Sequence, residues 1–396
     1  MSKIAFTPNA NGSGVFTLAS PNSNTNRTIT LPDESGTLLT SVGGTTGNLT
    51  VSGNLSVDGG TIKLDGNYPV GTGNVALGDT ALDDGSLSGG YNTAIGSSAL
   101  SDATSGNSNI AVGYQALRYA TTAAGNVSVG VNAMRDTLSG GSNIAVGQDA
   151  LRSNTTASNN TAVGYQAGYA NTTGAQNTAL GRVSMLTNTT GNYNVSVGSV
   201  ALYYNTTGSN NVALGTQALN NNTTASSNTA VGYQAGLSNT TGTYNTFVGK
   251  DAGFSNTTSS TNSFFGEYSG RSVTGESNTF YGQQSGHAIT TGAKNTIIGR
   301  YTGNQGGLDI RTSSNNIVLS DGDGNPRVYV DNAGNALLGK TSATDATVGI
   351  WLDATNGRGF FTSSNDYCAQ FRRLGNDGPV VYFMNDGVVA GYISVS

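Results

Sequence analysis

The sequence predicts an all-β fold, an elongated parallel β-solenoid or β-roll of about 14 coils, flanked by small β-rich regions at both ends. Two observations predict it. A short motif returns every 17 residues along most of the 396-residue chain, and self-similarity at a fixed period is typical of repeat architectures. The composition also disfavours helices, because Gly (58 residues), Asn, Thr and Ser make up about half of the chain and are all poor in helix interiors.

The repeated motif is Asn, then three residues that are mostly apolar or small, then Gly. Successive copies are separated by one step of 18 residues, ten of 17, one of 16 and one of 17. The copies begin at Asn74, Asn92, Asn109, Asn126, Asn143, Asn160, Asn177, Asn194, Asn211, Asn228, Asn245, Asn262, Asn278 and Asn295, with a weaker one at Asn316. So constant a register favours a folded repeat over a disordered low-complexity segment.

Each copy is expected to form one short strand that turns at its Gly. The third residue after the Asn is apolar from Leu77 to Ile298, apart from the phenol of Tyr281. The residue before it is Ala or Ser in the first ten copies, so large and small side chains alternate as on the two faces of a strand. Eight residues after the Asn, most early copies have Leu or Met and the late ones have Gly.

A second corner is equally regular. Asn-Thr-Thr begins at Asn154, Asn171, Asn188, Asn205, Asn222, Asn239 and Asn256, again 17 residues apart. In stacked coils these residues would form Asn and Thr ladders that hydrogen-bond from coil to coil. The alternative is a set of N-glycosylation acceptors, which does not explain the spacing.

Stacking is what allows such short units to fold. A coil of about 17 residues cannot bury a core alone, whereas stacked coils rising ~4.8 Å each form a section of roughly 65 Å. We expect the Ala/Ser face to be a flat, uncharged surface that packs on copies of itself, which predicts a homotrimer around a long axis. Phe247, Phe264 and Phe280 replace the small residue in late copies and predict a wider, more aromatic section.

The composition excludes several functions. The net charge is −5, with 17 Lys and Arg against 22 Asp and Glu, which disfavours nucleic-acid binding. One Cys and one His exclude intrachain disulfides, Cys-rich metal clusters and His-pair zinc motifs. No apolar run is long enough for a membrane span, and no secretory signal is visible at the start. We expect no cofactor, no metal and no membrane insertion.

The central repeat resembles the head repeats of trimeric autotransporter adhesins. The sequence Asn-Thr-Ala-Val-Gly-Tyr-Gln-Ala at 160–167 and 228–235 carries the resemblance, which covers about residues 74–303. Those heads are left-handed parallel β-rolls that trimerise, so the resemblance implies the same for residues 74–303. The repeat here is longer than the usual head repeat, which predicts larger corner loops.

The two ends resemble bacteriophage tail-fibre and virion-appendage proteins instead. At the N-terminus, Gly-Val-Phe-Thr-Leu at 14–18 precedes Asn-Arg-Thr-Ile-Thr-Leu-Pro-Asp at 26–33, and residues 48–60 resemble the short β-rich connectors common in such fibres. The resemblance implies a virion-attachment domain at 1–40, a connector at 41–73, the solenoid at 74–303 and a host-facing β-rich domain at 304–396.

The C-terminal end has the same kind of resemblance. Residues 369–378, then 381–383 and 391–393, resemble the segment that precedes the intramolecular chaperone of many tail fibres. In that family the chaperone drives trimerisation and is then cleaved off. No chaperone is visible in this chain, so we expect a mature or truncated fibre.

Candidate catalytic and metal-binding groups are few. Asp83 and Asp84 are the one adjacent carboxylate pair of the repeat region, and they are expected to form a solvated turn, since strand neighbours point apart. The sequence 321–325 begins like a calcium loop but lacks the later Gly and Glu, which favours a turn between strands. His287 is expected at the surface, with a metal site on a trimer axis as the alternative, and Cys368 as an inert thiol.

Two sets of side chains are candidates for receptor contacts. Arg118, Arg135 and Arg152 are 17 residues apart and predict a column on an exposed, solvated face, with an anionic-glycan strip as the alternative. Tyr114, Tyr165 and Tyr233 share one repeat position, and Tyr203 and Tyr204 lie near the other corner. Exposed Tyr can stack on sugars, although corner packing is the more common role. No individual receptor-binding residue is assigned.

These features together predict a non-enzymatic structural protein, a trimeric phage tail fibre or similar virion appendage. Its N-terminal region would attach to other tail or capsid proteins, and its exposed surface would bind a host-surface glycan or protein through multivalent contacts. The alternatives are a bacterial trimeric surface adhesin, disfavoured because no signal or anchor is visible, and a polysaccharide-degrading tailspike.

Overall fold

The computed structural model describes residues 71–84, 86–343, 348–362, 378–385 and 388–395. Within these ranges the chain forms 23 strands and no helix. The expected attachment domain and nearly all of the connector lie outside them. The strands are β1 (Val75–Leu77), β2 (Thr93–Ile95), β3 (Ile110–Val112), β4 (Val127–Val129), β5 (Ile144–Val146), β6 (Thr161–Val163), β7 (Thr178–Leu180), β8 (Val195–Val197), β9 (Val212–Leu214), β10 (Thr229–Val231), β11 (Thr246–Val248), β12 (Ser263–Phe265), β13 (Thr279–Tyr281), β14 (Thr296–Ile298), β15 (Asn304–Gln305), β16 (Leu308–Asp309), β17 (Ile317–Ser320), β18 (Pro326–Val330), β19 (Ala336–Leu338), β20 (Gly349–Asp353), β21 (Arg358–Thr362), β22 (Gly378–Asn385) and β23 (Val388–Val395).

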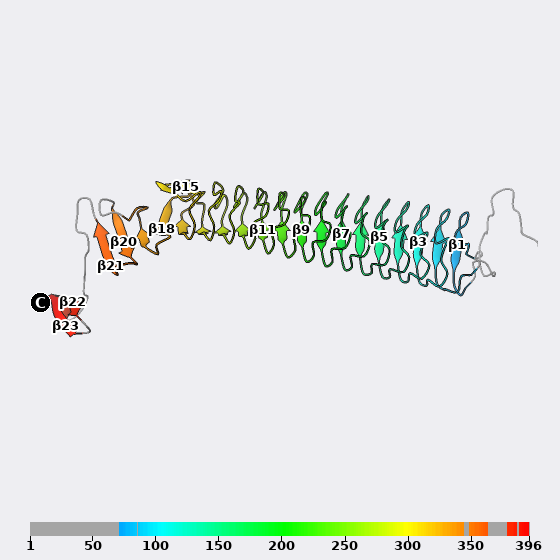
Figure 1. The fold of residues 1–396 in the computed structure, drawn as a ribbon, viewed down its shortest axis with the longest axis horizontal. Coiled ribbons are helices and arrows are strands. Elements are labelled where there is room, and N and C mark those ends of the chain that lie inside the picture. The colour runs from blue at the N-terminus through cyan, green and yellow to red at the C-terminus, as the bar shows by residue number, and fades with distance from the viewer. Residues whose placement is uncertain (1–70, 85, 344–347, 363–377, 386–387, 396) are drawn as a thin grey trace, which may run out of the picture. The chain divides into compact units, whose positions relative to one another are not determined.

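Strands β1 to β14 form one continuous parallel sheet in sequence order (Figure 1). Each strand has three residues and pairs with the equivalent three of the next coil, as Thr161 pairs with Thr178 and Val163 with Leu180. The corners between strands add further coil-to-coil bonds, such as Met134 N to the carbonyl of Ala150 at 2.9 Å. The predicted parallel β-solenoid of about 14 coils with a 17-residue repeat is therefore confirmed.

The sheet continues past the fourteenth coil. The weak copy at Asn316 supplies β17, which pairs in parallel with β14. From there β18, β19, β20 and β21 add in antiparallel order as a meander. Strands β15 and β16 form a separate two-stranded ribbon, as do β22 and β23. The meander therefore covers the strand edge that would otherwise be free at this end of the parallel stack.

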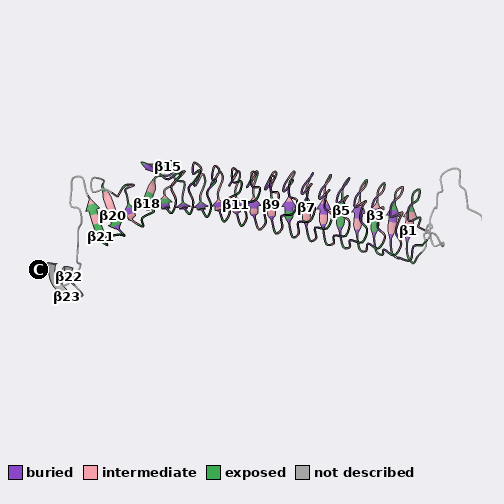
Figure 2. Cartoon of the chain, viewed as in Figure 1, coloured by how far each residue is buried: buried purple, intermediate pink, exposed green. Residues whose placement is uncertain are grey.

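The middle residue of each three-residue strand points into the coil, which reverses the predicted orientation of the sheet. Ala94, Ala162 and Ser196 are fully buried, and Figure 2 shows buried residues along the strands of the stack. The prediction that the Ala/Ser face is an exposed surface is wrong. The interior of a coil has room for only small side chains there, because the corner residue eight positions after the Asn, such as Leu100, is also fully buried.

In the late coils the sizes at the two positions are reversed: the strand carries the large side chain and the corner residue is Gly. Phe247, Phe264 and Phe280 occupy the middle strand position and are fully buried, so these rings lie inside their own coils. The corner residue opposite Phe264 is Gly270, where an added Cβ would lie 2.4 Å from two ring carbons. A large strand residue therefore requires a Gly corner, and a large corner residue requires Ala or Ser in the strand.

Buried Asn side chains connect the coils in two columns. The column before the strands is linked by backbone-to-side-chain bonds, as Asn177 N donates to Asn160 Oδ1 at 2.9 Å. The Asn-Thr-Thr column is linked by side-chain bonds, as Asn171 Nδ2 donates to Asn154 Oδ1 at 3.0 Å. The two columns also meet, since Nδ2 of Asn160 and Nδ2 of Asn171 both donate to the carbonyl of Gly174.

The Asn-Thr-Thr ladder is therefore confirmed, with one difference in its Thr rows. The Asn amides are buried and hydrogen-bonded in the fold, which leaves them inaccessible as glycosylation acceptors. From Thr155 to Thr240, the first Thr after the Asn donates its hydroxyl to a backbone carbonyl one coil further, as Thr172 Oγ1 does to Thr189 O at 3.0 Å. These bonds satisfy the polar groups of a narrow interior that holds little apolar surface.

Candidate functional site

The outer face of the parallel sheet is the largest regular feature of the coil surface. It consists of the first and third residues of strands β1 to β14 and is called the outer ladder below. The residues are Val75, Leu77, Thr93, Ile95, Ile110, Val112, Val127, Val129, Ile144, Val146, Thr161, Val163, Thr178, Leu180, Val195, Val197, Val212, Leu214, Thr229, Val231, Thr246, Val248, Ser263, Phe265, Thr279, Tyr281, Thr296 and Ile298. None is charged, and most are β-branched or apolar.

The outer ladder exposes much of this apolar surface. Among its most exposed members, the exposed fraction runs from 37% at Val146 to 62% at Tyr281. Covering the exposed half of a Val, Leu or Ile side chain contributes about 1 kcal/mol. Soluble monomers rarely expose large contiguous apolar patches, and patches of this kind mark interaction surfaces. The alternation in the sequence revealed the two faces, but the apolar face rather than the small-residue face is the one available to a partner.

The arginine column is less solvated than predicted. All three members are only partly exposed, namely Arg118, Arg135 and Arg152. Arg135 Nε lies 2.7 Å from Asp136 Oδ1, and Arg152 donates to the hydroxyl of Tyr169 at 2.9 Å. The Arg118 guanidinium lies 4.9 Å from the centroid of the Tyr119 ring. Because each has a neighbouring partner, the column offers less free positive charge than a solvated strip would.

Four of the five candidate tyrosines are exposed, in contrast to the more common corner packing, and Tyr203 is partly exposed. Tyr114, Tyr165 and Tyr233 each expose about half of their surface. Tyr204 is similarly exposed and contacts Tyr203 edge to face, with ring centroids 4.6 Å apart. Of these five, Tyr165, Tyr203 and Tyr204 line one groove together, and the structure does not group the other two with them.

The carboxylate pair of the repeat region forms a turn, as predicted. Asp84 Oδ1 accepts hydrogen bonds from the backbone N–H of Ser86 at 2.8 Å and from its hydroxyl at 2.5 Å. These bonds, with the side-chain bond the larger contribution, hold the pKa of Asp84 below its usual value. The carboxylate is therefore fixed within its own loop.

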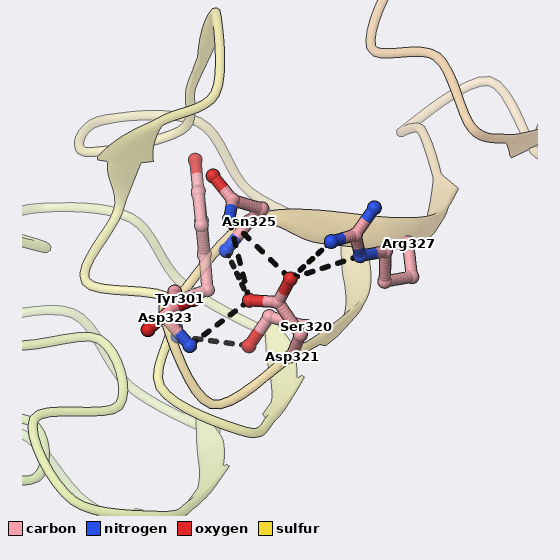
Figure 3. Close-up of polar contacts among 6 residues, drawn as sticks. All are labelled: Tyr301, Ser320, Asp321, Asp323, Asn325 and Arg327. Atoms are coloured by element: carbon pink, nitrogen blue, oxygen red, sulfur yellow. Dashed lines mark hydrogen bonds and ion pairs between the residues drawn. The ribbon is translucent and has the colours of Figure 1, made fainter.

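The calcium-like segment is the turn that joins β17 and β18, as predicted (Figure 3). Asp321 Oδ1 accepts the backbone N–H of Asn325 at 2.8 Å and that of Asp323 at 3.0 Å. Its other oxygen pairs with the Arg327 guanidinium. The backbone bond from Asn325 and the contacts with Arg327 lower the pKa of Asp321 to about 2. Its oxygens are thus committed to donors of the turn.

The remaining candidates are isolated groups. His287 is partly buried, and its ring meets that of Tyr268 edge to face at 6.2 Å. Burial, and then the nearby charge of Arg271, lower the pKa of His287, so the ring is neutral at pH 7. Across the described ranges no three His, Cys, Asp or Glu side chains gather in a way that could hold a metal ion. Cys368 lies outside those ranges.

Two valines that the repeat pattern does not single out mark a further site. Val183 and Val200 stand at a corner position that most coils fill with a polar residue, and they form part of the groove shared by the three tyrosines. In the portion of the chain covered by the structure, no helix is long and apolar enough to cross a membrane.

Comparison with known proteins leaves the fold and these surfaces as the basis for function. No protein-family model, no curated protein and no solved structure matches this chain.

Proposed function

We propose that this chain is a structural subunit of a bacteriophage tail fibre or similar virion appendage, acting as a trimer in host recognition and adsorption. Its N-terminal region attaches to other tail or capsid proteins, and the solenoid serves as a stiff spacer outside the host cell. The proposal is supported by the tail-fibre-like sequences at 14–33 and 369–393 and by the regular, hydrogen-bonded stack between them. The role is structural, without a catalytic step or a cofactor.

The observation that carries the trimer is the outer ladder. Fourteen consecutive strands present uncharged, largely apolar side chains on one face, and three chains that bury these faces against each other would share one long seam. At about 1 kcal/mol for each half-exposed aliphatic side chain that is covered, a few coils suffice for stable association. In a closed three-fold arrangement no outer ladder is left exposed. A dimer that packs two flat ladders face to face is the simplest alternative arrangement.

The oligomeric state tests this step directly. We expect analytical ultracentrifugation of the purified chain to give a mass three times that of the monomer. A paired substitution on the outer ladder, I144R with V146R, should yield monomers with an unchanged circular dichroism spectrum, because both side chains point away from the coil interior. The control T173R, at an exposed corner, should remain trimeric. A monomeric wild-type chain would contradict the proposal.

Immunogold labelling of virions and of host cells tests the biological setting. Label on phage tails supports the fibre, and label confined to bacterial surfaces supports the adhesin alternative, which the head-like sequence at 160–167 favours. The tailspike alternative predicts that oligosaccharides are released when the protein is incubated with host surface glycans. The fibre predicts no such release.

A further inference from the structure

A groove of about 420 Å³ crosses the corners of the four coils that contain β6 to β9. Its lining residues lie in the corner segments that come after these strands in the chain, and none of them belongs to the outer ladder. They are Tyr165, Gln166, Arg182, Val183, Leu186, Val200, Tyr203, Tyr204, Gln217 and Asn220. The groove is formed within a single chain and requires neither the proposed trimer nor the proposed function.

The groove exists because two adjacent coils carry short side chains at one corner position. The coils before and after have Gln166 and Gln217 there, while the two central coils have Val183 and Val200. Where Gln occurs in consecutive coils, the amides bridge across the surface, as Gln234 Nε2 donates to Gln217 Oε1 at 2.7 Å. Valine cannot make this bridge, so the surface is hollow at these coils and closed at both ends by Gln.

The two valines are also conformationally strained. Val183 has φ = 49° and Val200 has φ = 51°, in the left-handed region that β-branched residues rarely adopt. Asn, Asp or Gly would fit this position at lower cost, and other coils use Gln, Asn, Asp or Ser, with Thr80 and Tyr268 as the exceptions. Strain of this kind is found preferentially at binding and active sites, and here it coincides with the hollow part of the corner.

The walls of the groove combine aromatic faces, planar amides and one free cation. Tyr165 lies on one side, and Tyr203 and Tyr204 lie together two coils further along. Asn220 is held in place on the wall because its Nδ2 donates to the carbonyl of Val200 at 2.7 Å. The Arg182 side chain is exposed and makes no ion pair or ring contact within the described part of the chain, in contrast to the arginine column.

We propose that this groove binds an acidic oligosaccharide. Tyrosine rings stack on the apolar faces of sugars, the Gln and Asn amides both donate and accept and so match sugar hydroxyls, and Arg182 pairs with a carboxylate or phosphate group. The groove spans three coil spacings, or ~14 Å, which corresponds to a segment of a few sugar units. A shallow, open site of mixed aromatic and polar side chains fits this ligand better than an apolar one.

The experiment uses the full chain and an array of tri- to hexasaccharides that carry uronic acid, sialic acid or phosphate, each with its neutral counterpart and with an acidic peptide set beside them. We expect binding to one acidic class, weaker binding to its neutral counterpart, and affinity that falls as salt is raised. Titration calorimetry of the best binder with R182Q should show at least about tenfold weaker binding, while R135Q, in the arginine column, should leave the affinity unchanged.

A second variant tests the groove itself without removing a charged group. The double substitution V183Q with V200Q restores the residue that neighbouring coils use, so the coil stack and its unfolding midpoint should be kept while the groove is filled and binding is lost. The proposal is overturned if only neutral sugars or only acidic peptides bind, if nothing on the array binds, or if the best binder is unaffected by R182Q and by the V183Q/V200Q pair.

Discussion

In each coil the middle strand residue and the corner residue share one interior volume. Exchanging the sizes of these two side chains tests this directly. In the coil containing β12, Phe264 fills the strand position and Gly270 the corner. The variants are F264A, G270L and the double substitution, which recreates the Ala-and-Leu pairing of the coil containing β9, where Ala213 and Leu219 are both fully buried.

The structure sets the expected magnitudes. Phe264 is fully buried, so F264A should lower the free energy of unfolding by about 3–5 kcal/mol. In G270L the new Cβ would lie 2.4 Å from Cδ2 and Cε2 of Phe264, and overpacking of this kind costs about 1–3 kcal/mol or more. The backbone is not the obstacle, since Leu219 adopts φ = 47° at the equivalent position and Gly270 has φ = 58°. We expect the double variant to recover at least about 2 kcal/mol of the summed loss.

Guanidinium unfolding of the four proteins, followed by circular dichroism, measures the cycle, and hydrogen exchange of the amides at 262–270 locates it. The reciprocal pair A213F with L219G serves as the matched control and should show the same recovery. Complete recovery is not expected, because Phe264 also stacks on Phe280 with centroids 5.0 Å apart. If the losses in the double variant simply add, strand and corner do not share one interior volume and the reasoning is refuted.

Three further perturbations have defined outcomes. N188D replaces an amide that donates to Asn171 Oδ1 at 2.8 Å and should cost at least about 3 kcal/mol in denaturant unfolding, because a buried carboxylate would face acceptors; an unchanged midpoint would contradict the ladder. The pKa of Asp321 is lowered to about 2, so its stabilising contribution to the β17–β18 turn is present above its ordinary pKa and is lost as the pH falls toward 2. Hydrogen exchange between pH 5 and pH 2 should detect this loss in the wild type and not in D321N. Burial raises the pKa of Tyr301, so its stabilising contribution is lost above pH 10; Y301F, which removes the bond to the Leu308 carbonyl at 2.8 Å, should cost about 1 kcal/mol and abolish that alkaline dependence.

The fold could be predicted because the residues that hydrogen-bond between coils recur once in every coil. Asn160, Asn177 and their equivalents keep one spacing since each must reach the next coil. The Gly after each strand keeps the same spacing because another backbone lies close to it; a Cβ on Gly164 would lie 2.6 Å from the carbonyl oxygen of Gly181. Such constraints repeat with every coil and therefore appear directly in the sequence.

Which face of the strand is buried could not be read from alternation alone. A period of two separates Ala162 from Val163 without saying which of them faces the interior. The deciding residue is elsewhere in the coil, at the corner, where Leu100 or Gly270 sets the space left for the strand. The matched change from Ala-with-Leu to Phe-with-Gly was visible in the sequence, but its meaning depends on knowing that the two positions meet inside one coil.

The groove was hidden for a related reason. Its residues come from four coils and from several repeat positions: Tyr165 and Arg182 share one, Val183 and Val200 another, and Tyr203 lies at a third, so no single column shows them together. The signal that marks it is the replacement of Gln by Val at 183 and 200, a pair of apolar residues in a mostly polar column. The tail-fibre-like sequences at 14–33 and 369–377 lie outside the described ranges.

The central claim is that three chains pack through the outer ladder, and interchain distances measure it most directly. A spin label is attached to V163C, on the outer ladder, with C368S removing the native thiol, and electron double resonance reads the distances between labels. We expect a single short interchain distance of about 10–20 Å, since packed sheets lie ~10 Å apart, and a longer one for a label on T173C at the exposed corner. No interchain coupling at V163C, or a shorter distance at T173C, would contradict it.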